Sequence, residues 1–332
     1  MITLGDRIGM EEIHKEYGGY LPLELSGGKE YYEGEHFAAL NKARSAILLA
    51  IHQGRFSKIF LPVFMCPSVA EFLQRESSVE IEYYNIDIDF LPINIQLRDK
   101  QCILWANYFG ICGGGKIRKL SEKYKSQLII DNTQAFFCKP FGVAYFVYSC
   151  RKFFGVSDGA YLYQYNLTKQ NFASSISNTA GYLLETYNYG TNAQYAQSLI
   201  NEDKIKAEGL LSMSDLTHRI LESIDYDNVL KIRISNFMKM HELLSVYNEL
   251  DICLDNIDSP MVYPFVFTDD KIREKLIEKH VYVPQWWKAV IDNNLANLFE
   301  KKLSKYLLPL PIDQRYTDLD IEKIADIVKE CM

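Results

Sequence analysis

The stretch Leu-Ile-Ile-Asp-Asn-Thr-Gln-Ala-Phe at residues 128–136 places an acid and an amide directly after a short apolar run. Such a run is typical of a strand that is buried on both faces of a parallel sheet. Ligands of these sheets bind at the carboxyl ends of the strands, where Asp131 and Gln134 would lie. Because an aspartate in this position also caps the next turn in many proteins, the stretch alone leaves both roles open.

A second stretch, Ser-Cys-Arg-Lys-Phe-Phe-Gly-Val-Ser-Asp-Gly-Ala at residues 149–160, places Lys152 just after the apolar run 143–148. A lysine between a buried strand and a Gly-containing turn can be desolvated, which favours the neutral, nucleophilic amine. Most lysines near strand ends are simply solvated. Together, Asp131 and Lys152 are typical of a pyridoxal phosphate (PLP) site, because PLP needs an amine for a Schiff base and an acid for its pyridine nitrogen.

Apolar runs alternate with helical periodicity along the first half of the chain. We expect strands at 58–62, 81–85, 102–107, 127–131, 143–148 and 161–165, and helices at 41–53, 67–76 and 116–125. This alternation predicts an α/β fold, a mostly parallel sheet with helices on both faces.

The remaining sequence predicts a smaller C-terminal α+β domain. Residues 171–250 have a helical pattern, followed by a strand at 261–267 and helices at 271–279 and 321–331. We expect a large domain at 1–215 and a small one at 216–332, with the N-terminal segment a candidate to pack on the small domain.

Composition excludes several classes of function. The 332 residues carry a net charge of -7, dispersed along the chain, which argues against a nucleic-acid partner. The chain has neither an apolar run long enough for a membrane span nor a signal peptide at its start, so we expect a cytoplasmic protein.

Cysteine and histidine residues show no metal-binding spacing. The seven cysteines have no paired pattern and are expected to be buried free thiols, and no metal site is predicted. Residues 113–116, Gly-Gly-Gly-Lys, lack the spacing and the Ser or Thr of a nucleotide-binding loop, so we expect a flexible turn there.

Five further segments follow one another in a characteristic order: Leu-Asn-Lys-Ala-Arg-Ser-Ala-Ile at 40–47, Ile-Phe-Leu-Pro-Val-Phe-Met-Cys-Pro-Ser-Val at 59–69, Tyr-Asn-Ile-Asp-Ile-Asp at 84–89, Asn-Tyr-Phe-Gly at 107–110 and Leu-Pro-Leu-Pro-Ile-Asp-Gln-Arg-Tyr at 308–316. Together with the two stretches above, they resemble the DegT/DnrJ/StrS family of PLP-dependent sugar aminotransferases. The resemblance covers most of the chain and implies the fold of a fold type I PLP-dependent transferase.

The resemblance also implies roles for individual residues. Lys152 would form the Schiff base with the PLP aldehyde and shuttle the proton between substrate carbons. Asp131 would pair with the pyridine nitrogen, Gln134 would reach the ring hydroxyl, and Ser149 would bind the phosphate. The amides of Arg44, Ser45 and Ala46 would also bind the phosphate at a helix N-terminus, although Ser45 could equally be an ordinary N-cap.

Two departures from the family pattern concern the cofactor. Relatives often have a small residue and Gly where this chain has Lys42 and Ala43, and an aromatic that stacks on the ring where it has Cys66. Either another group then covers the ring face, such as Tyr108 or Phe109, or the cofactor is held less tightly.

The aromatic segments leave further alternatives open. The Tyr-Asn-Tyr-Gly segment at 187–190, with Asn188, is a candidate loop that a partner subunit sends to the cofactor phosphate, which implies a homodimer. The segment 282–287, Tyr-Val-Pro-Gln-Trp-Trp, packs in the small domain or contacts substrate at the site entrance.

The expected function is an aminotransferase that moves an amino group from an amino acid, glutamate by preference, to a keto sugar, nucleotide-linked by preference, or a similar carbonyl acceptor, in polysaccharide or secondary-metabolite biosynthesis. One alternative is a PLP-dependent dehydratase of the same fold, against which Lys152 argues because a histidine replaces the lysine there. The other is a non-catalytic binding protein that kept the fold.

Overall fold

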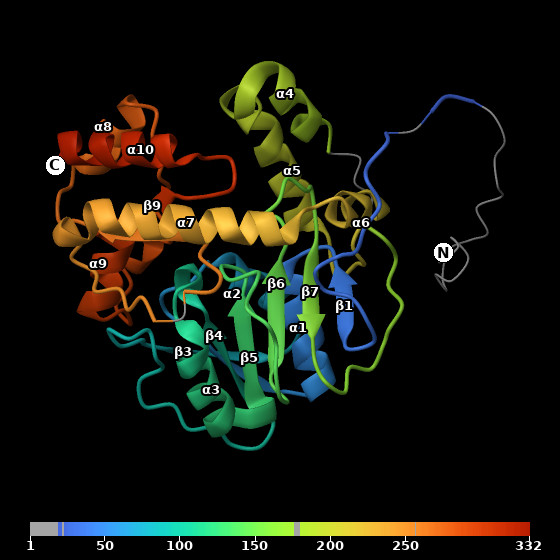
Figure 1. The fold of residues 1–332 in the computed structure, drawn as a ribbon. Coiled ribbons are helices and arrows are strands. Elements are labelled where there is room, and N and C mark those ends of the chain that lie inside the picture. The colour runs from blue at the N-terminus through green and yellow to red at the C-terminus, as the bar shows by residue number, and fades with distance from the viewer. Residues whose placement is uncertain (1–18, 22, 176–179, 256) are drawn as a thin grey trace.

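The computed structural model describes residues 19–21, 23–175, 180–255 and 257–332. A seven-stranded sheet, in the order β1-β7-β6-β5-β4-β2-β3, forms the centre of the larger part of the molecule (Figure 1). Its strands are β1 (Phe37–Leu40), β2 (Lys58–Pro62), β3 (Glu80–Tyr84), β4 (Gln101–Ala106), β5 (Leu128–Asn132), β6 (Tyr145–Ser149) and β7 (Ala160–Tyr163). Within the described residues, β7 alone runs antiparallel to its neighbours. The predicted α/β class with a mostly parallel sheet is confirmed.

Both faces of the sheet are buried. Successive strand residues point to opposite sides and enter two different apolar cores. In β4, Cys102 and Leu104 belong to one apolar core, while Ile103 and Trp105 belong to the other. The first core is closed by α1 (Ala43–Gly54) and α2 (Ser68–Glu76). The second is closed by α3 (Gly113–Tyr124) and continues into the C-terminal part.

The C-terminal part has its own small antiparallel sheet, made of β8 (Val262–Val266) and β9 (Leu307–Pro311). The long helix α7 (Tyr226–Leu244) lies across the end of the large sheet in Figure 1 and packs against α10 (Asp318–Cys331). The remaining helices of this part are α6 (Asp215–Glu222), α8 (Ile272–Glu278) and α9 (Leu298–Tyr306). The expected division at residue 215 stays a prediction.

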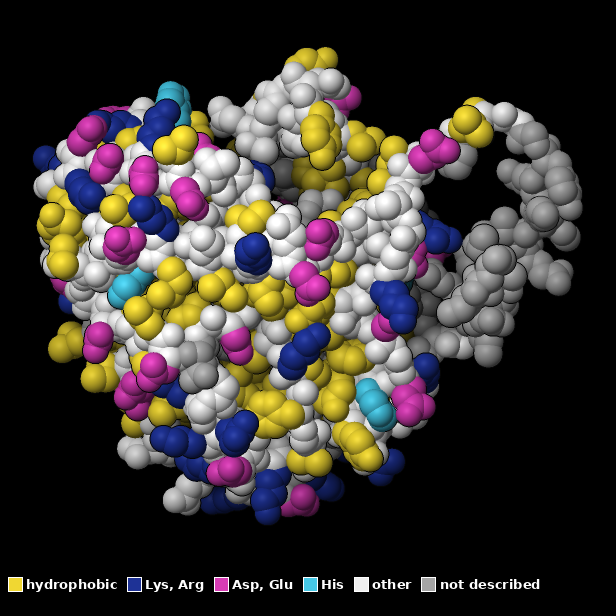
Figure 2. Space-filling model, viewed as in Figure 1, with side chains coloured by type: hydrophobic (Ala, Val, Ile, Leu, Met, Phe, Trp, Pro, Cys, Tyr) yellow, Lys and Arg dark blue, Asp and Glu magenta, His cyan; other side chains and the backbone are white. Residues whose placement is uncertain are grey.

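Helix α4 (Gly181–Ala193) stands out from the rest of the molecule, and α5 (Tyr195–Ala207) follows it and buries Asn201 and Ile205 (Figure 1). Figure 2 shows hydrophobic side chains on this projection, and Tyr187 is 92% exposed. The segment 187–189 therefore lies in a helix and not in the expected loop, and Gly190 interrupts that helix with a left-handed φ of 79°.

Several expectations need correction. The turn predicted at 113–116 is wrong, because α3 begins at Gly113. Strands β1 and β9 and helix α9 were not expected. All seven cysteines are free as predicted, but Cys253 is exposed and Cys66 is only half-buried.

No helix of the described chain is both long and apolar enough to cross a membrane. The described residues also contain no cluster of three His, Cys, Asp or Glu side chains that could hold a metal ion.

Candidate active site

A cavity of about 270 Å³ lies at the carboxyl ends of β4, β5 and β6. It brings together six of the predicted site residues: Arg44, Cys66, Asp131, Gln134, Ser149 and Lys152. Other lining residues are Lys42, Ala43, Ile47, Met65, Ser68, Val69, Ala106, Thr133, Arg151, Glu202 and Trp287. Residues far apart in the sequence therefore meet where ligands of such sheets bind.

Strands β5 and β6 present two buried oxygen groups to this cavity. Asp131 is 8% exposed, and its Oδ1 accepts a hydrogen bond from the Thr133 amide at 2.9 Å. Among the described residues, its second carboxylate oxygen and the hydroxyl of Ser149, itself 7% exposed, have no hydrogen-bond partner. Both groups line the cavity, so a bound ligand can pair with them.

Gln134 is oriented by a neighbouring loop. Its Oε1 accepts a hydrogen bond from the Phe109 amide at 2.7 Å, which leaves its amide nitrogen available at the cavity. The loop is fixed by Gly110, whose φ is 75° and where a Cβ would lie 1.9 Å from the Ser259 carbonyl oxygen. Only glycine fits there.

Lys152 projects from a tight turn after β6. The Cys150 carbonyl accepts hydrogen bonds from the amides of Phe153 at 3.0 Å and Phe154 at 2.9 Å, and Lys152 Nζ lies 3.3 Å from Thr133 Oγ1. The side chain reaches the Asp131 side of the cavity as expected. However, Lys152 is exposed in the single chain, so the expected desolvation by its own chain is wrong.

The turn that carries Lys152 is anchored from the C-terminal part. The Phe153 carbonyl accepts a hydrogen bond from Gln314 Nε2 at 2.8 Å and a longer one from Arg233 Nη2 at 3.5 Å. Arg233 is 2% exposed, stacks on the Phe153 ring at 4.5 Å and donates from Nε to Gln314 Oε1 at 2.9 Å. Burial lowers the pKa of Arg233 to about 10.

The opposite end of the cavity is rich in cations. Arg44 and Arg151 both line it, and Arg151 Nη2 donates to Glu202 Oε1 of α5. Burial lowers the pKa of the Arg44 guanidinium below its usual value. Together with Lys152, these groups give the cavity three cationic side chains against the carboxylates of Asp131 and Glu202.

The N-terminus of α1 differs from the expected phosphate site. The amides of Ser45 and Ala46 donate to the Lys42 carbonyl at 3.0 and 3.2 Å, and Ser45 Oγ donates to Asn41 Oδ1 at 2.8 Å. Neither Ser45 nor Ala46 lines the cavity. The amides left without a helical carbonyl are therefore those of Ala43 and Arg44, the first two of the helix.

Lys42 turns its amine toward α5. Its Nζ donates to the Ile205 carbonyl at 2.6 Å and to the Glu208 carbonyl, and it lies 4.6 Å from the centre of the Phe72 ring. Burial, followed by the nearby Arg44 charge, lowers the pKa of Lys42 to about 7. This residue ties the start of α1 to the end of α5.

A tryptophan, and not the expected tyrosine, supplies the aromatic side chain of the cavity. Tyr108 is fully buried, donates from its hydroxyl to the Phe64 carbonyl at 2.7 Å and lies outside the cavity. Trp287 lines the cavity beside Cys66 and packs edge-on against Phe64 at 4.5 Å. Its φ of 54° is strained for a bulky residue, a feature found often at functional sites.

Asn188 does not reach this cavity. It is exposed on α4 and is absent from the cavity lining of its own chain. Its expected role depends on a partner subunit.

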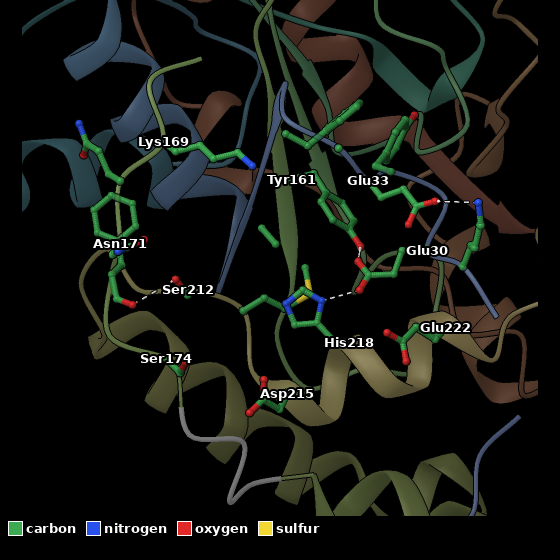
Figure 3. A pocket seen from close by; sticks show the side chains of 18 of the residues that line it. Glu30, Glu33, Tyr161, Lys169, Asn171, Ser174, Ser212, Asp215, His218 and Glu222 are labelled. Carbon is green, nitrogen blue, oxygen red and sulfur yellow. Dashed lines mark hydrogen bonds and ion pairs between the residues drawn. The ribbon is translucent and has the colours of Figure 1, made fainter. Parts of the chain in front are cut away.

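A larger cavity of about 530 Å³ lies elsewhere, beside β1, β7 and α6 (Figure 3). Its buried carboxylate, Glu30, contacts His218 Nδ1 at 2.5 Å and the Tyr161 hydroxyl, while the more exposed Glu33 lies 3.7 Å from Lys29. These charged groups satisfy each other, and none of the predicted site residues lines this cavity.

Sequence reasoning gave no role in the candidate site to Arg151 or Glu202. Arg151 adjoins Lys152 in the quoted stretch but carries no signal that separates it from a surface arginine. Glu202 lies fifty residues further along the chain and reaches Arg151 only through the position of α5. Trp287 was singled out in its segment, with packing or substrate contact left open, and it does line the cavity.

Comparison with known folds finds sugar aminotransferases across most of the chain. A DegT/DnrJ/EryC1/StrS aminotransferase from Brucella abortus matches with a TM-score of 0.60 and 13% identity, covering 89% of this chain and 86% of the other. The aminotransferase TlmJ from Streptoalloteichus hindustanus matches with a TM-score of 0.62 and 14% identity, covering 89% and 85%. The sugar aminotransferase CalS13 from Micromonospora echinospora matches with a TM-score of 0.61 and 10% identity, covering 89% and 87%.

These structural neighbours are DegT/DnrJ/EryC1/StrS sugar aminotransferases at low sequence identity, so the chain has the fold of these fold type I PLP enzymes. No protein-family profile matches the sequence. No curated protein matches it either. The likeness therefore concerns the fold, and the chemistry has to be argued from the cavity.

Proposed function

We propose that this protein is a PLP-dependent aminotransferase whose site is the cavity at the ends of β5 and β6. The observation that carries the proposal is the free carboxylate oxygen of Asp131 and the free hydroxyl of Ser149, both buried and both facing the cavity that Lys152 enters. Both groups can pair with a ligand without breaking a hydrogen bond of the chain itself.

The groups of PLP find matching partners here. A pyridine nitrogen suits Asp131, a ring hydroxyl suits the amide nitrogen of Gln134, and an aldehyde suits the Lys152 amine. A phosphate suits Ser149, the first amides of α1 and the guanidinium of Arg44. When bound, PLP supplies the electron sink that stabilises a carbanion next to the transferred nitrogen.

The chain itself supplies binding, orientation and proton transfer. Asp131 would keep the pyridine nitrogen protonated, because its second oxygen has no partner in the chain and would accept that proton's hydrogen bond. Lys152 Nζ takes the proton from one substrate carbon and returns it to another as a general base and acid. Thr133 Oγ1, at 3.3 Å, accepts a hydrogen bond from this amine and fixes its direction.

We further propose glutamate as the amino donor and a keto sugar, in nucleotide-linked form, as the acceptor. Support comes from the fold, which is shared with proteins described as sugar aminotransferases. The cavity of about 270 Å³ suits the cofactor itself but lies below the range of about 300–1,000 Å³ common for larger ligands. The acceptor would therefore lie at its mouth, near Trp287.

The test is the first half-reaction. Purified protein incubated with PLP should turn yellow, and borohydride should fix the cofactor to Lys152 in the peptide 149–160. Addition of L-glutamate should then release 2-oxoglutarate. Lys152→Ala should abolish both results, whereas Lys206→Ala, a change of an exposed lysine on α5, should leave them intact. A wild-type protein that takes up no PLP would refute the proposal.

The two alternatives give different outcomes in the same experiment. A non-catalytic binding protein, suggested by Lys42 and Cys66 at divergent positions, would bind PLP and convert none of a panel of amino donors. A dehydratase would need a residue other than the lysine at position 152, and Lys152 disfavours it.

We also propose a homodimer in which α4 contacts the partner's site. Three apolar side chains of this helix are unusually open to solvent, namely Leu184 at 57%, Tyr187 at 92% and Tyr189 at 66% exposure. Tyrosine-rich apolar patches are enriched at interfaces. Light scattering at micromolar concentration should give twice the monomer mass of 38.5 kDa, and a fully active monomer would contradict the shared site.

A further inference from the structure

The cationic end of the cavity already contains an anion of the protein itself. Arg151 Nη2 donates to Glu202 Oε1, and Glu202 lines the cavity together with Arg44 and Ser149. Within the described residues, the Nε of Arg151 is buried and has no acceptor. The guanidinium of Arg151 thus donates one hydrogen bond to a carboxylate, while its Nε–H has no acceptor.

Glu202 is held in place by a fixed helix. On one side of it in α5, Asn201 Nδ2 donates to the Ser157 carbonyl at 2.9 Å. On the other side, the carbonyls of Ile205 and Glu208 accept hydrogen bonds from Lys42 Nζ. These contacts link α5 both to the turn after Lys152 and to the start of α1, so the Glu202 carboxylate is directed into the cavity.

We propose that Glu202, whose side chain is 51% exposed, is a counter-ion of the anion-binding end of this cavity, which a dianionic phosphate monoester must displace from Arg151 when it binds. The proposal deepens the proposed function and rests on it for the identity of the natural ligand. Phosphate is bound best by a guanidinium that offers two parallel N–H groups. Glu202 uses one of these on Arg151, and two anions side by side would repel each other.

Two consequences follow for the cavity. In the absence of ligand, Glu202 relieves the repulsion among Arg44, Arg151 and Lys152. In its presence, the carboxylate lowers the affinity for every anion, and most for anions that approach Arg151 as closely as Glu202 does. Glu202 would therefore set how tightly the cofactor is held, without touching the reacting atoms.

The test uses inorganic phosphate and the cofactor-free full chain. Calorimetric titration at a pH where phosphate is a dianion should show about two- to fivefold tighter binding to Glu202→Gln than to wild type. Asp203→Asn removes a charge from the adjacent exposed position of α5 and should leave the affinity unchanged. Equal or weaker binding to Glu202→Gln would overturn the proposal, because Glu202 would then orient Arg151 for the anion. Failure of both proteins to bind phosphate would overturn it as well.

A second pair of probes separates this inference from the proposed function. PLP should bind Glu202→Gln about two- to fivefold tighter than wild type, while pyridoxal, which lacks the phosphate, should bind both alike. Tighter phosphate binding without any PLP uptake would leave the counter-ion in place and refute the aminotransferase. If Glu202→Gln does not fold, Glu202→Asp, which withdraws the carboxylate from Arg151, should give a smaller gain in phosphate affinity; no gain would count against the proposal.

Discussion

The two ends of the candidate site are built in different ways. At the strand end, Asp131 and Gln134 sit on or directly after β5 and turn polar atoms toward the cavity. At the cationic end, Arg44, Arg151 and Glu202 come from three distant segments, and two of them pair with each other.

This difference separates what the fold supplies from what this chain has added. The strand end follows from the sheet, since carboxyl ends of parallel strands meet at one edge and place their next residues together. At the cationic end, the Ser45 and Ala46 amides bond the Lys42 carbonyl, and the guanidinium groups of Arg44 and Arg151 line the cavity. We expect changes at the strand end to act on the reaction rate and changes at the cationic end to act on cofactor affinity.

The largest effect is expected for Asp131→Asn, which keeps the shape and removes the charge from the strand end. The rate of the glutamate half-reaction should fall by about 10³-fold, since the carboxylate stabilises charge that develops in the transition state. Stopped-flow absorbance of the PLP-loaded protein measures this rate. Asp99→Asn, at an exposed site, is the control. If the rate of Asp131→Asn stayed within a few-fold of the wild-type rate, the Asp131 carboxylate would have no role in the reaction.

The second largest effect is expected at the cationic end, where a change should act on cofactor affinity and not on the rate. Arg44→Ala should weaken PLP binding by roughly 10- to 100-fold, which corresponds to the loss of one hydrogen bond to a charged group. The half-reaction rate at saturating PLP should change little. A fluorescence titration gives the affinity and stopped-flow the rate. If the rate fell as much as in Asp131→Asn, the division between the two ends would be wrong.

A smaller effect is expected for Trp287, the aromatic side chain that lines the cavity. Trp287→Leu should weaken PLP binding by about two- to tenfold, the usual worth of one aromatic contact. Its neighbour offers a matched control, because Trp286 stacks on Phe109 at 5.9 Å and does not line the cavity. Equal losses in both variants would indicate a packing effect and not a contact with the ring.

Sequence reasoning reached the strand end more fully than the cationic end, for a physical reason. A buried strand and the polar residue after it are neighbours in the chain, so the pattern of β5 predicts the position of Asp131. The pairing of Arg151 with Glu202 depends on where α5 packs, and local periodicity does not encode that. Tyr108 was expected at the cavity, but Trp287 lines it. Both are aromatic, and only the tertiary fold decides which one faces the cavity.

The same limit applies to the fold. Strands β2 to β8 were predicted within about two residues, because apolar runs between turns are strong signals. Strand β9 was missed because the two prolines of its Leu-Leu-Pro-Leu-Pro sequence disfavour a strand, and it survives by pairing on one side with β8. Helix α3 starts at three glycines, which by propensity alone predict a turn.

The smallest effect concerns the tie between the cationic end and α5. The folded state lowers the pKa of Lys42 from 10.5 to about 7, so between these values the unfolded chain holds a proton that the folded chain has lost. The free energy of unfolding should therefore rise with pH in this window, on the order of 1–2 kcal/mol from pH 7 to 9.

Lys42→Met should lack this increase. Urea denaturation of both proteins at pH 7 and pH 9 measures the difference. Parallel changes in the wild type and Lys42→Met would show that Lys42 stays charged against the Ile205 and Glu208 carbonyls.

The anchor of Phe153 has a mechanical consequence. Arg233 and Gln314 belong to the C-terminal part, yet both donate to the carbonyl of the residue that follows Lys152. A hinge movement of the C-terminal part would pull this carbonyl, and the lysine with it, unless the guanidinium lost its buried acceptors. The Lys152 amine would then move together with the C-terminal part. A ligand that closes the C-terminal part over the cavity would also orient the amine.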